Sequence, residues 1–330
     1  MTGFPTRRPR RRRVTAAMRD LTAETELTVA DLVAPLFVRE AIPDPVEIAS
    51  LPGQYQHTID SLRREVGHLA NLGVRSVMLF GVPAHKDDVG SGASDPDGVV
   101  QLALAALRAD LGDDVVVMAD LCIDEYTDHG HCGLLDAGGG VDNDATIARY
   151  AEIAVAQATA GAHVVAPSGM MDGQVGAIRA ALDAAGFQHV AILAYSAKYA
   201  SGLYGPFRDA VDVTIAGGGD RKAYQQDVRN IRESLIEVAA DLDEGADMVM
   251  VKPAVTYLDV IAAVRARTDV PVAAYHVSGE YAMIAAAAAN GWIDFDQVAV
   301  EQLTAIRRAG ADIVLTYLAR WFAETQEARR

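Results

Sequence analysis

The chain has 330 residues, of which 51% are hydrophobic, and a formal net charge of −16. This length can bury the core of one large domain, and the acidic balance argues against a nucleic-acid partner. No apolar run has the length of a membrane span and the start lacks a secretory signal core, so we expect a cytoplasmic protein without a membrane partner.

Residues 1–30 differ from the rest of the chain. Six arginines lie between Arg7 and Arg13, and no acidic residue occurs before Asp20. Such a segment is typical of a nucleic-acid-binding or targeting tail, and also of a basic arm that docks on the acidic body of a neighbouring subunit. We interpret it as an arm for self-association.

Four times along the chain, an alanine-rich stretch is followed by a glycine-containing pair and a short apolar strand. Glycine suits the left-handed conformation at a helix end, and an unbroken apolar run is typical of a parallel strand covered on both faces. The repeats span residues 72–80, 160–167, 244–251 and 309–316. Eight strands are predicted in total, because further apolar runs occur at residues 33–38, 115–120, 190–195 and 270–277.

Helical stretches separate most of these strands, for example at residues 147–159, 231–242, 258–267 and 301–308. Eight strand–helix units predict a closed (β/α)8 TIM barrel over residues 31–330. A doubly wound open sheet is the main alternative, but no glycine-rich dinucleotide fingerprint follows the first strand. Long connections at residues 81–110 and 196–230 are expected to be lids or binding loops, with glycines 217–219 as a hinge.

Polar residues follow the ends of six predicted strands. In a barrel the carboxyl ends of all strands meet at one rim, and the active site lies there. We therefore expect a functional site built from strands that are far apart in the sequence. The six residues are Asp120, Ser168, Lys198, Lys252, Ser278 and Tyr317.

Two of these residues, Lys198 and Lys252, lie just past the ends of apolar strands. A lysine amine has an unperturbed pKa of about 10.4, and burial or a second cation lowers that pKa and frees the lone pair. Two lysines in one pocket would depress each other and favour Schiff-base formation with a carbonyl substrate. The alternative is that each lysine caps its strand and reaches into solvent.

Five segments of the chain carry a resemblance to a known family: residues 126–133, 165–173, 196–208, 249–259 and 274–283. In this order they resemble the porphobilinogen synthase (5-aminolevulinate dehydratase) family. Both lysine segments match, and the similarity extends from about Pro9 to near the C-terminus. The resemblance implies a TIM-barrel lyase that condenses two molecules of 5-aminolevulinate into porphobilinogen, an early step of haem biosynthesis.

Residue roles follow by matching position. The resemblance implies that Lys252 forms a Schiff base with the substrate that becomes the propionate side, and Lys198 with the substrate that becomes the acetate side. Asp120 is a candidate for proton transfer near these amines. A class I aldolase would need one lysine only, and a non-enzymatic scaffold would need neither.

The resemblance also assigns the substrate carboxylates. Arg208, Arg221 and Gln225 would hold that of the second substrate, and an arginine fork suits a carboxylate. Ser278 and Tyr317 would hold that of the first. The family implies a homo-octamer in which the arms wrap neighbouring subunits.

The segment that matches the family's metal loop departs from its zinc-binding members, which have three cysteines there. This chain has Cys122, Asp124 and Cys132. Two thiolates and a carboxylate can bind Zn2+ and leave a fourth position open, whereas Mg2+ does not prefer thiolates. A vestigial site, a disulfide or another metal are the alternatives. His129 and His131 flank the loop, and the resemblance suggests that they are structural or substrate-facing.

A second metal site is implied around Glu233. Family members bind a structural or allosteric Mg2+ through the matching carboxylate, and Asp172 could join through water. Without the resemblance, Glu233 would be interpreted as an acid in the first turn of a helix, where the dipole favours it. His276 stands where glutamine is frequent in the family, so we expect a changed contact on the substrate side.

Overall fold

The computed structural model describes residues 6–216 and 219–328. Eight parallel strands form a closed barrel, because β1 pairs with β10 through Leu32 and Val314. The TIM-barrel prediction is confirmed, and the open sheet is excluded. The barrel strands are β1 (Leu32–Arg39), β4 (Ser76–Val82), β5 (Val116–Leu121), β6 (Val164–Pro167), β7 (Ala191–Lys198), β8 (Met248–Lys252), β9 (Val272–His276) and β10 (Ile313–Thr316).

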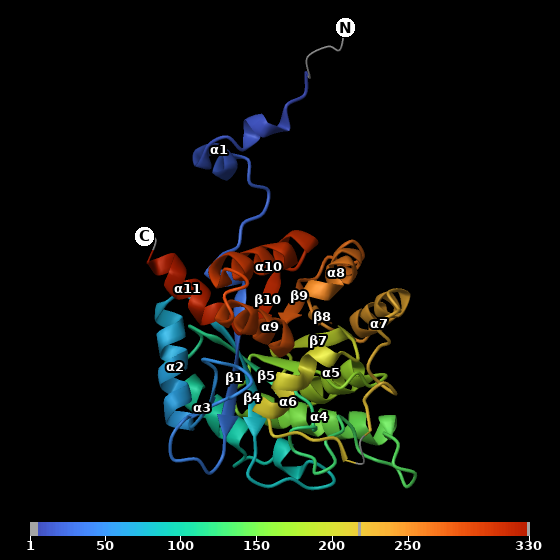
Figure 1. Cartoon of the computed structure of the whole chain (residues 1–330). Coiled ribbons are helices and arrows are strands. Elements are labelled where there is room, and N and C mark those ends of the chain that lie inside the picture. The colour runs from blue at the N-terminus through green and yellow to red at the C-terminus, as the bar shows by residue number, and fades with distance from the viewer. Residues whose placement is uncertain (1–5, 217–218, 329–330) are drawn as a thin grey trace.

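Helices surround this barrel (Figure 1). They are α2 (Ile59–Asn71), α3 (Val99–Leu111), α4 (Asn143–Thr159), α5 (Gln174–Ala184), α6 (Gly205–Ala210), α7 (Arg232–Asp243), α8 (Leu258–Arg265), α9 (Ser278–Ala289), α10 (Phe295–Ala309) and α11 (Ala319–Glu327). Their faces follow from helical spacing. In α2, for example, Leu62, Val66 and Leu69 recur at intervals of four and three residues and are all buried.

The four helices predicted from sequence correspond to α4, α7, α8 and α10. Two of them begin earlier than predicted because an aspartate caps each start. Asp142 accepts a hydrogen bond from the backbone N–H of Ala145, and Asp294 accepts one from that of Gln297. A short hairpin of β2 (Val46–Glu47) and β3 (Tyr55–His57) was not predicted, because strands of two or three residues carry too little pattern.

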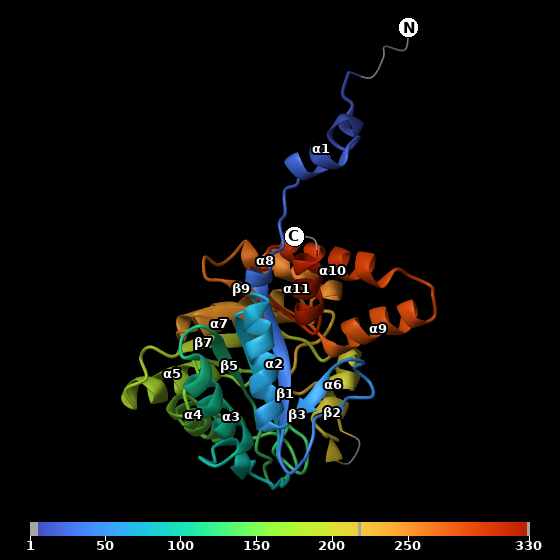
Figure 2. The same ribbon diagram turned by 90° about the vertical axis from the view of Figure 1, so that its left-hand side faces the viewer.

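The N-terminal segment extends away from the barrel and includes the short helix α1 (Ala16–Leu21), as Figures 1 and 2 show. Residues 6–21 are all exposed, with Val14, Met18 and Leu21 among the exposed apolar side chains. An apolar surface of this kind on an extended segment suits contact with another molecule. Within the described residues, no helix combines the length and apolarity needed to cross a bilayer.

The two long connections lie at the carboxyl ends of β4 and β7. The second carries α6 and a 3-10 helix, Gly202–Tyr204, and returns to the barrel at α7. Its position over the rim suits the lid expected from sequence. Gly217 and Gly218 of the predicted hinge lie outside the described residues.

Candidate active site

A cavity of about 210 Å³ opens at the carboxyl ends of the strands. Residues at or just beyond the ends of β5, β6, β7 and β8 contribute to it together with the connection that follows β7. It brings together six of the residues predicted for catalysis and substrate binding. These are Asp120, Lys198, Arg208, Arg221, Gln225 and Lys252.

Lys252 ends β8 and is only 5% exposed. Its Nζ lies 4.5 Å from the ring centre of Tyr275, 5.1 Å from those of Tyr195 and Phe207, and 5.2 Å from that of Tyr204. Burial, and then the charge of Lys198, lower the pKa of Lys252 to about 7. The amine is thus available in its neutral, nucleophilic form near neutral pH.

Lys198 is the register partner of Lys252 on the neighbouring strand, and it is 4% exposed. Its Nζ donates to the carbonyl oxygen of Ser168. Burial lowers the pKa of Lys198, but its electrostatic interactions with Cys132, Cys122 and the nearby carboxyl groups outweigh burial and raise it. The expectation that the two lysines depress each other therefore holds for Lys252 alone.

A strand irregularity helps to build this arrangement. Tyr195 and Lys198 are three residues apart, so in a regular strand they would face opposite sides of the sheet. The pairing of β7 with β8 shifts register between Ala194 and Ala197. Both the ring of Tyr195 and the amine of Lys198 consequently lie on the Lys252 side, with Lys198 Nζ 5.7 Å from the ring centre.

Asp120, near the end of β5, is bonded to the residue that also holds Lys198. The hydroxyl of Ser168 donates to Asp120 Oδ2 at 3.0 Å, while Asp120 Oδ1 has no hydrogen-bond partner among the described residues. Burial raises the pKa of Asp120 to about 6, although both lysines lower it. A carboxyl group with this pKa beside two amines can accept or return a proton near neutral pH.

The lid residues predicted to bind a substrate carboxylate differ in whether they already have hydrogen-bond or ion-pair partners. Arg208 on α6 is half-buried and lines the cavity, and Gln225 is buried with its Nε2 donor unpaired among the described residues. Arg221 is 11% exposed and already holds a carboxylate, because its Nη2 lies 2.7 Å from Asp124 Oδ2. The same nitrogen donates to the carbonyl of Gly130 at 2.8 Å.

Ser278 and Tyr317 do not line this cavity. Ser278 Oγ accepts from the backbone N–H of Phe207 at 3.0 Å and donates to the carbonyl of Leu203 at 3.4 Å. The hydroxyl of Tyr317 is bonded to that of Tyr275 at 3.0 Å. In this conformation, the hydroxyl of Ser278 is bonded to the lid and that of Tyr317 to a residue of the barrel core.

Sequence reasoning missed the aromatic surroundings of Lys252. The rings come from β7, β9, the 3-10 helix Gly202–Tyr204 and α6, and only the fold brings them together. A signal was nevertheless present, because Tyr204 and Phe207 lie in the first lysine segment and Tyr275 in the 274–283 segment. Glu125, a buried carboxyl group that also lines the cavity, was missed as well.

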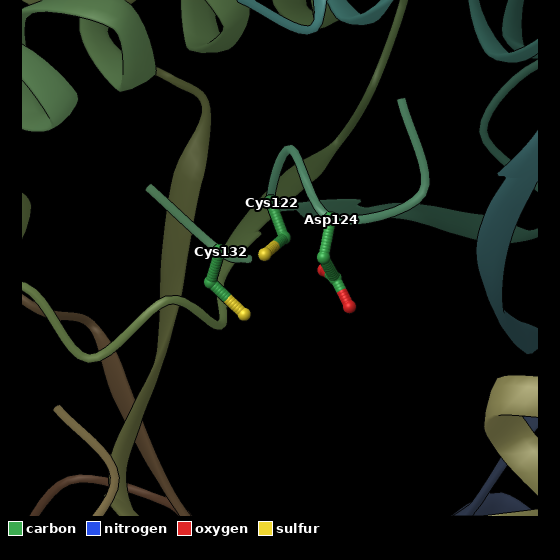
Figure 3. A group of neighbouring side chains, drawn as sticks. All are labelled: Cys122, Asp124 and Cys132. Atoms are coloured by element: carbon green, nitrogen blue, oxygen red, sulfur yellow. The ribbon is translucent and has the colours of Figure 1, made fainter. Parts of the chain in front are cut away.

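Cys122, Asp124 and Cys132 form one buried group (Figure 3), and Asp124 also lines the cavity. One ligand atom from each residue lies within 4.8 Å of the others, and both cysteines are free thiols. Burial raises the pKa of Cys122, whereas Arg221 holds the pKa of Asp124 below its usual range against the effect of burial. The donor set fits a thiophilic cation, with Arg221 as a competitor for the carboxylate.

The two flanking histidines are bonded elsewhere. His129 Nε2 lies 3.3 Å from the carbonyl oxygen of Asp88, and His131 Nδ1 lies 3.3 Å from the hydroxyl of Tyr224. Neither belongs to the Cys122–Asp124–Cys132 group. These contacts suit a structural role in the loop.

Glu233 lines a second cavity, of about 400 Å³, which shares Lys222 and Gln225 with the first. It is in the first turn of α7, where its Oε2 accepts from Asn230 Nδ2 at 2.9 Å. Asp172 and Glu237 line the same cavity. Burial, then the charges of Asp172 and Glu233, raise the pKa of Glu237, so negative charge is concentrated here.

His276 does not contact the cavity, contrary to the expectation from sequence. Its Nδ1 is bonded to Thr316 Oγ1 and its Nε2 to Gln302 Oε1, both at 3.0 Å. Burial lowers the pKa of His276 to about 4, so the ring is neutral. Because Tyr275 faces Lys252, the next residue of β9 faces α10 on the outside of the barrel.

The sequence model of the family described as delta-aminolevulinic acid dehydratase matches residues 6–325. The delta-aminolevulinic acid dehydratase of Streptomyces coelicolor is 59% identical over 324 residues, which cover 98% of each chain. That of Mycobacterium tuberculosis is 60% identical over 321 residues, which cover 97% of each chain.

A solved structure agrees with these sequence matches. The delta-aminolevulinic acid dehydratase (porphobilinogen synthase) of Toxoplasma gondii, solved with its reaction product porphobilinogen, superimposes with a TM-score of 0.95. It is 44% identical, and the match covers 97% of this chain and 92% of that one. The barrel, the order of its segments and these similarities over nearly the whole length show that the chain belongs to the delta-aminolevulinic acid dehydratase family.

Proposed function

We propose that this protein condenses two molecules of 5-aminolevulinate into porphobilinogen, forming one carbon–carbon and one carbon–nitrogen bond and releasing two molecules of water. It is a lyase of the dehydratase type. Membership in the family supports this, and one structural observation carries it. Lys198 and Lys252 are register partners on adjacent strands, and both line one buried cavity.

We infer that Lys252 forms the obligatory Schiff base. Its neutral amine adds to the ketone carbon of the substrate that becomes the propionate side, and loss of water leaves an imine. The pKa of about 7 supplies the free lone pair, and the surrounding rings stabilise a cationic iminium through their faces.

Lys198 would form the second Schiff base, with the substrate that becomes the acetate side. Because its pKa is raised, Lys198 must first lose a proton. Ser168 donates its hydroxyl to Asp120 and accepts from Lys198 at its carbonyl, so it holds both groups together. We propose Asp120 as the group that takes up this proton and returns it during the water-releasing steps.

Substrate carboxylates would bind on two sides. We assign the second substrate's carboxylate to Arg208, Arg221 and Gln225, and it would compete with Asp124 for Arg221. We assign the first substrate's carboxylate to Ser278 and Tyr317. A carboxylate would take the Ser278 O–H, which now donates to the carbonyl of Leu203, so substrate entry would be coupled to a movement of the lid.

We propose Zn2+ at Cys122, Asp124 and Cys132, which provide two soft donors and one hard one. When bound, such an ion supplies Lewis acidity for an amine, water or carbonyl oxygen next to it. We propose that Mg2+ acts outside the active centre through Glu233, with Asp172 joining through water.

The arm, residues 1–30, is proposed to mediate assembly into a homo-octamer, and residues 31–330 to form the catalytic barrel. The exposed apolar side chains of α1 support a contact with a neighbouring subunit. The free thiols of Cys122 and Cys132 suit a reducing compartment, and we propose the cytoplasm.

The decisive experiment is a colorimetric assay of porphobilinogen formed from 5-aminolevulinate by the purified full-length protein. It would be run without added metal, with Zn2+, with Mg2+ and with both ions. Porphobilinogen should form under at least one condition. Absence of product under all four conditions would overturn the proposed activity.

A further inference from the structure

Glu280 is a buried carboxylate that the proposed chemistry does not use. It is 1% exposed, and it lies in the first turn of α9. A buried carboxylate is costly unless its oxygens are well bonded. The oxygens of Glu280 accept from backbone N–H groups of two different segments, at Val277, Ala254 and Val255.

The first of these segments directly follows Lys252. The strand ends at Lys252, Pro253 has no N–H group, and the next two amides turn toward Glu280. Val255 donates to Glu280 Oε1 at 2.6 Å and Ala254 to Oε2 at 3.4 Å. The carboxylate thereby fixes the path of the chain just beyond the proposed nucleophile.

The second segment is the start of α9, where Val277 donates to Glu280 Oε2 at 2.7 Å. The next two residues pack against the lid. Ser278 accepts from the backbone of Phe207, and a Cβ atom placed on Gly279 would lie 2.5 Å from the carbonyl oxygen of Leu203. The first turn of α9 is therefore held close to the lid segment 203–207.

The lid segment, in turn, contacts Lys252. The hydroxyl of Tyr204 donates to the carbonyl of Lys252 at 3.2 Å. The rings of Tyr204 and Phe207 lie 5.2 and 5.1 Å from Lys252 Nζ. The backbone and side chain of Lys252 are thus held by a lid segment that packs on the helix turn carrying Glu280.

We propose that Glu280 is a positioning residue, which sets the place of the Lys252 amine by joining the chain after β8 to the start of α9 and, through it, to the lid. This inference rests on the proposed function, since it assumes that Lys252 is the nucleophile. A displacement of about 1 Å at a reacting group can cost on the order of 100-fold in rate.

The test measures how fast Lys252 is trapped as a borohydride-reduced adduct with 5-aminolevulinate, located by peptide mass spectrometry. In Glu280→Gln an amide group replaces one carboxylate oxygen, and its N–H groups face backbone N–H donors. We expect the adduct rate at Lys252 and kcat to fall at least about 10-fold. Glu280→Asp keeps the carboxyl group and should recover part of the rate. The matched control, Glu301→Gln, removes an exposed glutamate on α10 and should behave as wild type.

Rate and amplitude separate positioning from stability. A variant that merely folds poorly gives less adduct at saturation but forms it at the wild-type rate, whereas a displaced amine forms it slowly in protein that is fully folded by circular dichroism. Wild-type rates of adduct formation in both Glu280 variants would overturn the inference and leave the proposed function standing. A loss confined to the amount of adduct at saturation would do the same. If Glu280→Gln does not fold, Glu280→Asp decides by the same criterion. No adduct on Lys252 in the wild-type protein would overturn the proposed function, and the inference with it.

Discussion

The two lysines occupy equivalent places on adjacent strands, yet their surroundings differ. Lys252 is enclosed by the rings of four aromatic residues, whereas Lys198 lies on the side of Asp120, Asp124 and the two thiols. The pKa of Lys252 is lowered to about 7, and that of Lys198 is raised. Burial is nearly the same for both, so burial does not decide which amine is reactive.

The sign of the neighbouring charges decides which of the two amines is reactive. Desolvation alone would lower the pKa of either lysine, and an adjacent cation adds to this effect while nearby acidic groups oppose it. We therefore infer a division of labour, in which Lys252 is ready to attack and Lys198 depends on proton transfer. This difference can be tested from each side.

Removing the amine on the aromatic side should have the largest effect. Lys252→Ala deletes the proposed nucleophile, and we expect turnover to fall on the order of 1000-fold or more. The measurement is the porphobilinogen assay, together with the mass of the borohydride-reduced protein. Near wild-type turnover in this variant would show that the roles of the two lysines have been assigned wrongly.

Removing the amine on the acidic side should leave the first step intact. We expect Lys198→Met to lose turnover on the order of 100-fold but still to form the Lys252 adduct. Lys252 reacts as the neutral amine, so adduct formation in the wild type should fall as the pH drops through about 7. Loss of the Lys198 charge removes one cause of the lowered pKa of Lys252. The acid limb of the pH profile of adduct formation should therefore move to higher pH.

The control for that shift is Lys198→Arg, which keeps a positive charge beside Lys252. Its limb should stay near the wild-type position, although turnover is lost. The comparison is made on the rate of trapped adduct between pH 5.5 and 9. A limb that is unchanged in Lys198→Met would show that the two amines are not coupled.

The sequence was sufficient to predict the barrel, because buried parallel strands leave unbroken apolar runs and their carboxyl ends converge. It placed both lysines at the rim for the same reason. Side-chain direction was harder to predict. His276 was expected near the substrate but faces α10, and the alternation of β9 would have revealed this once Tyr275 was known to face inward.

The surroundings of the lysines could not be predicted from sequence. Their contrast depends on rings from four elements, on the register shift in β7 and on the pairing of Arg221 with Asp124. Each is a tertiary contact between segments far apart in the chain. The motifs name the residues at a site but do not show which of them already have partners.

The proposed metal ligands lie on the acidic side of the site, near Lys198. We expect Asp124→Cys to slow zinc loss to a mild chelator on the order of 10-fold, because a thiolate is a softer ligand and no longer pairs with Arg221. The matched control is Asp128→Cys, which adds a thiol at an exposed position of the same loop. Metal analysis after timed chelation is the measurement. Equal zinc loss from both variants would contradict a role of Asp124 as a ligand.

The smallest effect is expected outside both lysine environments. Glu233→Gln should abolish stimulation by Mg2+ while leaving basal turnover and the Lys252 adduct unchanged, because Glu233 does not line the cavity that holds the two lysines. A change of charge in a helix's first turn also alters stability by about 0.3–1 kcal/mol, so the control must match it. Asp296→Asn does so, since Asp296 is an exposed acid in the first turn of α10.

Turnover would be titrated with Mg2+ in the wild type and in both variants. If the response is lost in Glu233→Gln alone, the ion acts through this carboxylate and reaches the lysines from a distance. If Mg2+ still stimulates Glu233→Gln, the ion binds elsewhere, and the acidic side of the active site becomes the next place to look for it.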